Sequence, residues 1–285
     1  MSLPGRLLNI DGVRIFCHRS GPHRRVPIVF AHGYLVGHWA WRHVLPPLAN
    51  AGHDVIAFDF PGAGESDRPP PAEYGYDASA FVRTLMGVLD ALEIERAIVV
   101  GHSMGAGVSL LAAAERPERF EQLVAIDPLV YKFSLPLDAH VLLAPLVGQS
   151  LFRLLASKWA LRRYFRTVYR DPSLVSPEWV DYLFERLSRP GGLEAAHATM
   201  QFLVDSTSVE HGVRAVRTPT LIVWGEEDRL FPSAWSQRLA AEIQGAKAVI
   251  VPACGHAPAE ERPEAVVAIL TKFLASVHQP HRAVG

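Results

Sequence analysis

The chain has 285 residues, of which 49% are hydrophobic, so it can bury the core of one large domain. Its formal net charge of -1 provides no overall attraction to nucleic acid or to anionic membranes. The two cysteines, Cys17 and Cys254, lie far apart in sequence, which argues against a disulfide framework or a cysteine metal site. Residues 1–10 lack the apolar region of a signal peptide, and no apolar run approaches the ~18 residues of a membrane span. We therefore expect a cytoplasmic protein.

Short apolar runs alternate with helical patterns along most of the chain. A hairpin is predicted over Leu7–His18, with its turn at Asp11-Gly12. The later runs show little polar alternation, which is typical of strands buried on both faces of a parallel sheet. These predicted strands are Pro27–Ala31, Val55–Asp59, Ala97–Val100, Leu123–Ile126, Thr220–Trp224 and Ala248–Val251. The predicted helices are His38–Ala51, Ala78–Leu92, Gly105–Glu115, Ser233–Gln244 and Pro263–Ser276. The alternation predicts an α/β fold with a doubly wound, mostly parallel sheet.

The segment from residue 131 to residue 212 interrupts this alternation. It contains no convincing strand pattern and is typical of several helices rich in aromatic residues. Such an insertion between two strands predicts a helical cap over the carboxyl edge of the sheet, where ligands bind in open α/β folds. Residues 1–130 and 213–285 then form the core. Most aromatic side chains of the insertion are expected to pack inside the cap, and a few to line a pocket.

Ser103 lies at the centre of Gly101-His102-Ser103-Met104-Gly105, between a predicted strand and a predicted helix. This is the context of the G-x-S-x-G turn, which projects a serine hydroxyl at the top of a sheet. The two glycines remove side chains that would collide with the neighbouring strand and helix. The N-terminus of the following helix directs backbone N–H groups at whatever the serine attacks. The pattern therefore predicts that Ser103 is a nucleophile.

A nucleophilic serine needs a base that takes its proton and an acid that orients the base. His256 follows the last predicted strand, and Asp228 follows the strand Thr220–Trp224, so both are expected at the carboxyl edge of the sheet. The order Ser103, Asp228, His256 is the order in which this type of turn uses its partners. Asp127, directly after Leu123–Ile126, stays open as an alternative acid.

Two backbone N–H groups are predicted to stabilise the negative oxygen of an acyl-transfer transition state. Met104 follows the nucleophile directly, and Tyr34 lies in Ala31-His32-Gly33-Tyr34, where Gly33 permits a close backbone approach. The Asp59–Ser66 segment lacks the third glycine of a dinucleotide-binding motif and is interpreted as a structural loop. We therefore expect no organic cofactor, and no His-x-x-x-His pair with a nearby acid suggests a zinc site.

With these motifs in order, nearly the whole chain resembles the α/β-hydrolase family. The resemblance implies Ser103 as nucleophile, His256 as base, Asp228 as acid, and an oxyanion hole formed by the backbones of Tyr34 and Met104. Serine in place of aspartate at the nucleophile position disfavours haloalkane dehalogenase and epoxide hydrolase activity. The lipase-type His-Gly-Gly-Gly loop is absent. The chain is thus similar to the capped serine esterases, which implies hydrolysis of a small carboxylic ester without cofactor or metal.

Related activities remain open. Meta-cleavage C–C hydrolases use the same triad but need a cationic or polar clamp for an acidic substrate. A basic run in the cap could supply one, although a solvated helix face is the favoured interpretation of that run. It consists of Lys158, Arg162, Arg163, Arg166 and Arg170. Hydrolysis of lactones or amides is a further alternative, and so is a small-ligand receptor that keeps a triad. No local motif specifies the acyl group, the alcohol or the oligomeric state.

Overall fold

The computed structural model describes residues 3–23, 26–132, 141–144 and 147–277. Within them, eight strands form one sheet in the order β1-β2-β4-β3-β5-β6-β7-β8. β1 (Arg6–Ile10) and β2 (Val13–Ser20) form the predicted hairpin, and β2 also pairs antiparallel with β4 (Val55–Phe58). From β4 onward the sheet is parallel and contains β3 (Ile28–Ala31), β5 (Ala97–His102), β6 (Phe120–Ile126), β7 (Thr220–Gly225) and β8 (Lys247–Val251). The predicted mostly parallel α/β sheet is confirmed.

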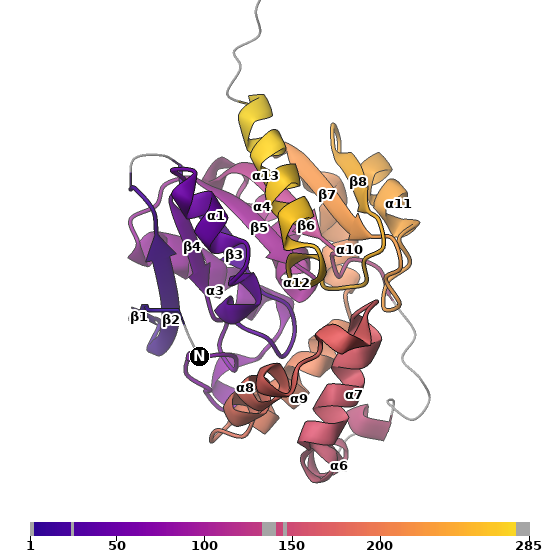
Figure 1. The fold of residues 1–285 in the computed structure, drawn as a ribbon. Coiled ribbons are helices and arrows are strands. Elements are labelled where there is room, and N and C mark those ends of the chain that lie inside the picture. The colour runs from indigo at the N-terminus through magenta and orange to yellow at the C-terminus, as the bar shows by residue number, and fades with distance from the viewer. Residues whose placement is uncertain (1–2, 24–25, 133–140, 145–146, 278–285) are drawn as a thin grey trace, which may run out of the picture.

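Helices cover both faces of this sheet (Figure 1). One face carries an apolar cluster to which α3 (Ala78–Ala91), α4 (Met104–Glu115) and α11 (Trp235–Glu242) contribute. The other face carries a second cluster, formed with α1 (Leu45–Asn50) and α13 (Pro263–Val277). Every residue of β3 and β4 is buried, because these central strands are covered on both sides. Among the described residues, no helix is both long enough and apolar enough to cross a bilayer.

The predicted helix over His38–Ala51 is divided in the structure. A 3-10 helix, η1, spans His38–Trp41, and α1 begins only at Leu45. Pro46 and Pro47 stand in the first turn of α1, where a missing N–H is tolerated. Neither proline can donate a hydrogen bond to a carbonyl one turn earlier, so the helix cannot continue upstream. The four-residue helices α2 (Pro71–Tyr74) and α12 (Pro258–Glu261) are too short to give a periodic signal.

Between β6 and β7 the described part of the chain forms helices. The longer ones are α6 (Gly148–Leu155), α7 (Lys158–Val168), α8 (Pro177–Leu187) and α9 (Gly192–Val204), and Figure 1 shows them gathered on one side of the core. Their buried aromatic residues include Phe165, Trp179 and Tyr182, which form a separate apolar cluster. Short helices η3 (Val141–Leu143), η4 (Pro172–Leu174), α10 (Thr207–Gly212) and η5 (Val213–Ala215) complete the segment, as η2 (Pro117–Arg119) does before β6. We propose that α6 to α9 form the cap, called the proposed cap below; the exact bounds 131–212 stay a prediction.

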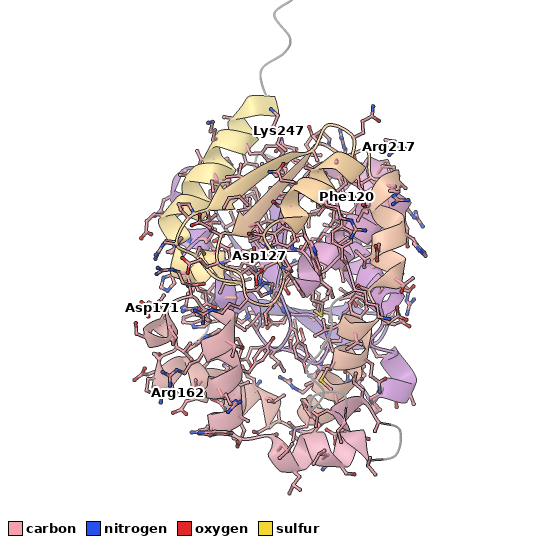
Figure 2. The ribbon with its side chains drawn as sticks, turned by 90° about the vertical axis from the view of Figure 1, so that its right-hand side faces the viewer. Phe120, Asp127, Arg162, Asp171, Arg217 and Lys247 are labelled. Carbon is pink, nitrogen blue, oxygen red and sulfur yellow. The ribbon has the colours of Figure 1, made fainter. Side chains whose placement is uncertain are left out.

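The proposed cap faces the carboxyl ends of the parallel strands. Figure 2 shows Phe120, at the start of β6, near the end of the molecule that is far from the proposed cap. Asp127, directly after the end of the same strand, lies at the centre, between the sheet and the helices α6 to α9. Any loop that leaves a parallel strand at this edge is therefore directed toward the space beneath the proposed cap.

Candidate active site

The turn between β5 and α4 holds Ser103 in an unusual backbone conformation. Its φ angle is 51°, in the left-handed region that a non-glycine residue adopts only when the surrounding structure enforces it. Two backbone hydrogen bonds enforce it here. The Ser103 N–H donates to the carbonyl of Ile126 at 2.9 Å, and the Ser103 carbonyl accepts from the N–H of Leu129 at 3.0 Å. The turn is thus fixed to the end of β6.

The two glycines of this turn permit very close packing. A Cβ on Gly101 would lie 2.5 Å from the Cα of Ala106. A Cβ on Gly105 would run into the backbone carbonyls of Ala31 and His32 at the end of β3. Because no side chain fits at either position, α4 can start directly against the sheet, as the sequence predicts.

Ser103, His256 and Asp228 come together at the carboxyl edge of the sheet. The Nε2 atom of His256 lies 2.9 Å from the Oγ atom of Ser103, and its Nδ1 atom lies 2.7 Å from Oδ2 of Asp228. The other carboxylate oxygen, Oδ1 of Asp228, accepts from the N–H groups of Leu230 and Phe231. This leaves Oδ2 directed at the imidazole, so Nδ1 carries the proton and the lone pair of Nε2 faces the serine hydroxyl.

The electrostatics of this chain of groups suit proton transfer. Burial by itself raises the pKa of Asp228, but the charge and hydrogen bond of His256 outweigh burial and hold that pKa below its usual value. Burial likewise lowers the pKa of His256, yet the Asp228 carboxylate beside it raises the pKa above the ordinary 6.5. The aspartate therefore stays ionised, and the imidazolium is stabilised once it forms.

Asp127, the alternative acid, lies close to the same histidine but is placed differently. Its Oδ1 atom accepts from the N–H of Gly225 at 2.8 Å, and its buried Oδ2 atom has no hydrogen-bond partner. Burial, followed by the charge of Asp228, raises the pKa of Asp127 well above its usual value. This environment favours the protonated, neutral form of Asp127 more than water favours that of an ordinary carboxyl group. Asp228, which is ionised and bonded to Nδ1, is therefore the better partner for His256.

Three residues beside Ser103 have atoms that could bind a metal ion, but their hydrogen bonds do not fit a metal site. His102, Asp127 and His256 each place one atom of a ligand type within 4.8 Å of the others. However, both ring nitrogens of His256 are engaged, and Nε2 of His102 lies 2.7 Å from the carbonyl of His256. A metal ion here would have to break the contact with Ser103 or with Asp228. Burial, aided by His256, also lowers the pKa of His102 to about 3, so His102 is neutral.

The loop after β3 brings a second backbone to the serine. A Cβ on Gly33 would lie 3.2 Å from the Cβ of Ser103, which is closer than most such contacts, so glycine eases this approach. The loop is braced by His32, whose Nδ1 donates to the carbonyl of Gly33 at 2.7 Å and whose Nε2 accepts from the N–H of Phe60 at 2.9 Å. Tyr34 follows at once, and Met104 opens α4, where the first N–H groups have no partner within the helix. Both residues line the cavities next to Ser103.

Two cavities meet at Tyr34. The first is lined by Tyr34, Met104 and Phe81 among others, and the second by Tyr34, Ser103 and His256. They contain about 440 and 530 Å³ of empty space, which includes space open to solvent. The Tyr34 hydroxyl donates to the carbonyl of Ala196 on α9 at 2.9 Å, which ties the loop to the proposed cap. The second cavity also contains aromatic residues of α7 and its C-terminal end, namely Tyr164, Phe165 and Tyr169.

The first cavity is lined by two arginines that the sequence does not predict to lie there. They are Arg68, on the loop after β4, and Arg186, near the end of α8. In both side chains the buried Nε–H has no hydrogen-bond partner. Glu65 pairs with Arg186 and with Arg189 at 2.5 and 2.6 Å, which offsets part of the positive charge. No local signal identifies these arginines, because one is on a loop and the other on a distant helix.

The basic run of α7 does not form the clamp considered from the sequence. Arg162, Arg163 and Arg166 are exposed, and Lys158 pairs with Asp181 on the surface of α8. None of the residues in the run lines either cavity. The favoured interpretation, a solvated helix face, agrees with this geometry.

Comparison with known proteins shows which family and which relatives this chain is similar to. Residues 26–263 match the family described as alpha/beta hydrolase fold. The chain is 33% identical over 279 residues to 2-hydroxymuconate semialdehyde hydrolase of Pseudomonas sp. (strain CF600), covering 95% of this chain and 94% of the relative. It is 32% identical over 280 residues to 2-hydroxy-6-oxo-2,4-heptadienoate hydrolase of Pseudomonas putida, covering 95% and 96%. A solved meta-cleavage product hydrolase, CumD of Pseudomonas fluorescens IP01, is 26% identical with a TM-score of 0.82, covering 96% and 98%.

The chain belongs to the α/β-hydrolase family, as the resemblance of its motifs implies. Hydrolase activity follows from this membership and from the relatives it matches. The relatives named here are C–C bond hydrolases rather than carboxylesterases, so the comparisons support the class of enzyme without the ester specificity.

Proposed function

We propose that this protein is a serine hydrolase that cleaves carboxylic esters through an acyl-enzyme, with Ser103 as nucleophile, His256 as base and Asp228 as acid. The observation that carries the proposal is the unbroken hydrogen-bond chain from Ser103 Oγ through both nitrogens of His256 to Asp228. His256 accepts the hydroxyl proton at Nε2 while Oγ forms a bond to the carbonyl carbon. The N–H groups of Tyr34 and Met104 stabilise the resulting oxyanion.

The second half of the reaction uses the same groups. His256 returns the proton to the leaving alcohol as the bond between the carbonyl carbon and its oxygen breaks. A water molecule then gives a proton to Nε2 and attacks the acyl-enzyme. His256 passes this proton to Ser103 Oγ as the carboxylic acid is released. The two cavities beside Tyr34 offer separate places for the acyl part and the alcohol part of a small substrate.

C–C bond hydrolysis is the second candidate. It is favoured by the names of the two Pseudomonas relatives and by Arg68 and Arg186 in the first cavity, which suit a substrate carboxylate. In that reaction His256 takes the proton of Ser103 while Ser103 Oγ attacks a ketone carbon. The electron pair of the broken C–C bond stays on the leaving carbon, which must be protonated, and water then hydrolyses the acyl-enzyme. The pairing of Glu65 with Arg186 weakens the case, because it neutralises one of the two cations.

A direct comparison of substrates separates the candidates. Purified protein and its Ser103→Ala variant are assayed on nitrophenyl esters of graded acyl length and on a ring-fission dienoate. We expect kcat/KM to be higher on an ester, and the variant to lose about 10⁴-fold or more on every substrate it normally cleaves. Faster cleavage of the dienoate would make the C–C hydrolase the function. Matched lactones and amides test the remaining alternatives.

The proposal fails altogether if Ser103→Ala retains the parent rate. A triad without measurable turnover on any of these compounds, combined with a large melting shift on binding a small ligand, would indicate a receptor instead.

A further inference from the structure

Large apolar side chains are exposed between residues 147 and 159, from the start of α6 to the first turn of α7. They are Val147 (56% exposed), Leu154 (80%), Leu155 (53%) and Trp159 (70%), and they are called the apolar outer face below. Val147 and Leu154 are two helical turns apart, so they point to the same side. Trp159 follows on α7, whereas Phe165 and Trp179 of the proposed cap are buried. The exposure is therefore a local property of this face and not of the proposed cap as a whole.

The charge around this face has one sign. Segment 147–170 contains no aspartate or glutamate, and its basic residues are Arg153, Lys158, Arg162, Arg163, Arg166 and Arg170. Arg153, Lys158 and Arg170 pair with Glu194, Asp181 and Glu227 of other elements. Within the described part of the chain no ion pair involves the three central arginines of α7. Their charge is left for an outside partner, although exposed Glu178 and Asp181 on α8 lie on the neighbouring helix.

The basic and apolar groups lie next to each other. The guanidinium carbon of Arg163 lies 5.7 Å from the ring centre of Trp159. Arg162 and Arg166 are four residues apart, on one side of α7, and Figure 2 shows Arg162 at the outer edge of the molecule. Leucine and tryptophan flanked by arginine are typical of helices that lie in the interface of a bilayer.

We propose that the apolar outer face docks this protein onto an anionic lipid bilayer. Leu154, Leu155 and Trp159 enter the headgroup region, and the arginines of α7 contact lipid phosphates. A second copy of the chain is the weaker partner, because a two-fold contact through this face would bring the unpaired arginines of both copies together. The overall net charge of -1 hides this local asymmetry.

This inference is independent of the catalytic proposal. None of the four apolar residues and none of the arginines of α7 lines either cavity beside Ser103. Docking can therefore be lost without loss of the active site, and a failure of the ester proposal leaves docking in place.

The first test is binding of the full chain to extruded vesicles. We expect cosedimentation with vesicles of phosphatidylcholine and phosphatidylglycerol, little with phosphatidylcholine alone, and release at about 0.5 M salt. Tryptophan fluorescence gives an independent readout, because the side chain of Trp159 is 70% exposed and lies on the proposed docking face. Its emission is expected to shift to the blue on binding and to be quenched by brominated acyl chains. Absence of binding to anionic vesicles would overturn the proposal.

Two matched charge-reversal variants test whether the arginines of α7 belong to the surface that binds vesicles. Each arginine at an anionic surface contributes about fivefold to partitioning, so Arg162→Glu/Arg166→Glu is expected to weaken binding at least about 25-fold. The control Lys247→Glu/Lys272→Glu makes the same change of charge at exposed positions on β8 and α13, and Figure 2 shows Lys247 at the opposite end of the molecule. The control is expected to bind almost as the parent does.

Two further outcomes would also overturn the proposal. One is an equal loss of binding in both charge reversals, which would mean a non-specific charge effect. The other is self-association in sedimentation velocity that Arg162→Glu/Arg166→Glu abolishes, without any vesicle binding. Leu154→Ser/Trp159→Ser tests the apolar part and is expected to weaken vesicle binding about tenfold. Far-UV circular dichroism and ester turnover of each variant verify that the fold and the active site are intact.

Discussion

At the scale of single residues, the hydrogen bond between Asp228 and His256 determines the pH at which the proposed mechanism works. Only neutral His256 can accept the proton of Ser103 at Nε2. Burial lowers the pKa of His256, but Asp228 raises it above 6.5, so activity should disappear as the pH falls through a value above 6.5. The measurement is kcat/KM of the parent protein between acidic and alkaline pH. A rate that does not change with pH would contradict the role of His256.

Asp228→Asn removes the charge that raises the pKa of His256 and the acceptor that selects its tautomer. We expect kcat to fall by about 10⁴-fold and the remaining activity to persist to lower pH. Asp127→Asn is the matched control, because Nδ1 of His256 bonds to Asp228 rather than to Asp127, and an amide oxygen can still accept from the N–H of Gly225. It should change kcat by no more than about threefold. The reverse ranking of the two variants would make Asp127 the catalytic acid.

Tyr34 lines both cavities, and its backbone N–H is proposed to stabilise the oxyanion. Tyr34→Phe keeps the ring but loses the hydrogen bond to Ala196, and we expect about 1 kcal/mol less free energy of unfolding. Tyr34→Ala enlarges the cavities, so its preference should move toward bulkier acyl groups by about tenfold. Denaturant unfolding and kcat/KM across an ester series measure the two effects. Similar substrate profiles for both variants would remove the ring from any role in specificity.

At the scale of the elements, the turn that carries Ser103 depends on contacts between β3, β5 and α4. Gly105→Ala would press a methyl group against the carbonyls of Ala31 and His32, which belong to the backbone and cannot rotate away. We expect a loss of about 2 kcal/mol or more in the free energy of unfolding, together with most of the activity. Gly52→Ala is the control: nothing lies within 4 Å of its Cβ, and its positive φ costs only about 1 kcal/mol. Equal effects of the two substitutions on activity would contradict this account.

The surroundings of each strand and helix explain which elements the sequence predicts well. β3 to β7 appear as continuous apolar runs because both faces of the sheet are covered there, whereas β8 at the edge of the sheet is only partly buried. Each predicted strand is present with small shifts at its ends. The predicted helix over His38–Ala51 is wrong in extent, because apolar spacing does not register that two prolines prevent it from continuing upstream.

At the scale of the whole molecule, Glu65 links the core to the proposed cap. It lies on the loop after β4 and pairs with Arg186 and Arg189 at the end of α8 and just beyond it. Glu65→Gln leaves the buried Arg186 short of its counter-charge, so we expect a loss of about 2 kcal/mol in the free energy of unfolding. Glu185→Gln removes a mostly exposed partner of the same two arginines and should cost no more than about 0.5 kcal/mol. Urea unfolding of both variants makes the comparison.

The ion pairs of Glu65 should make the free energy of unfolding fall as the pH becomes acidic. Burial raises the pKa of Glu65, but its hydrogen bond to Arg189 and the charge of Arg186 outweigh burial and bring that pKa below 4.5. The carboxylate therefore stabilises the folded state above the pKa of the unfolded chain, and this contribution is lost as the pH falls through the lower folded value. Glu65→Gln should flatten the stability curve in that acidic range. An unchanged curve would contradict the link.

Local chemistry and chain order were enough to indicate the α/β fold, the strained turn at Ser103 and its proposed partners. This is possible because a strand followed by a tight glycine turn and a helix is a local pattern, and because loops that leave parallel strands converge on one edge. Two features depend on the tertiary structure alone: Asp228 rather than Asp127 bonds to Nδ1 of His256, and Arg68 and Arg186 rather than the basic run of α7 line the cavity. Burial, neighbouring charges and the packing of distant segments determine these features, and none of them is encoded in residues adjacent in sequence.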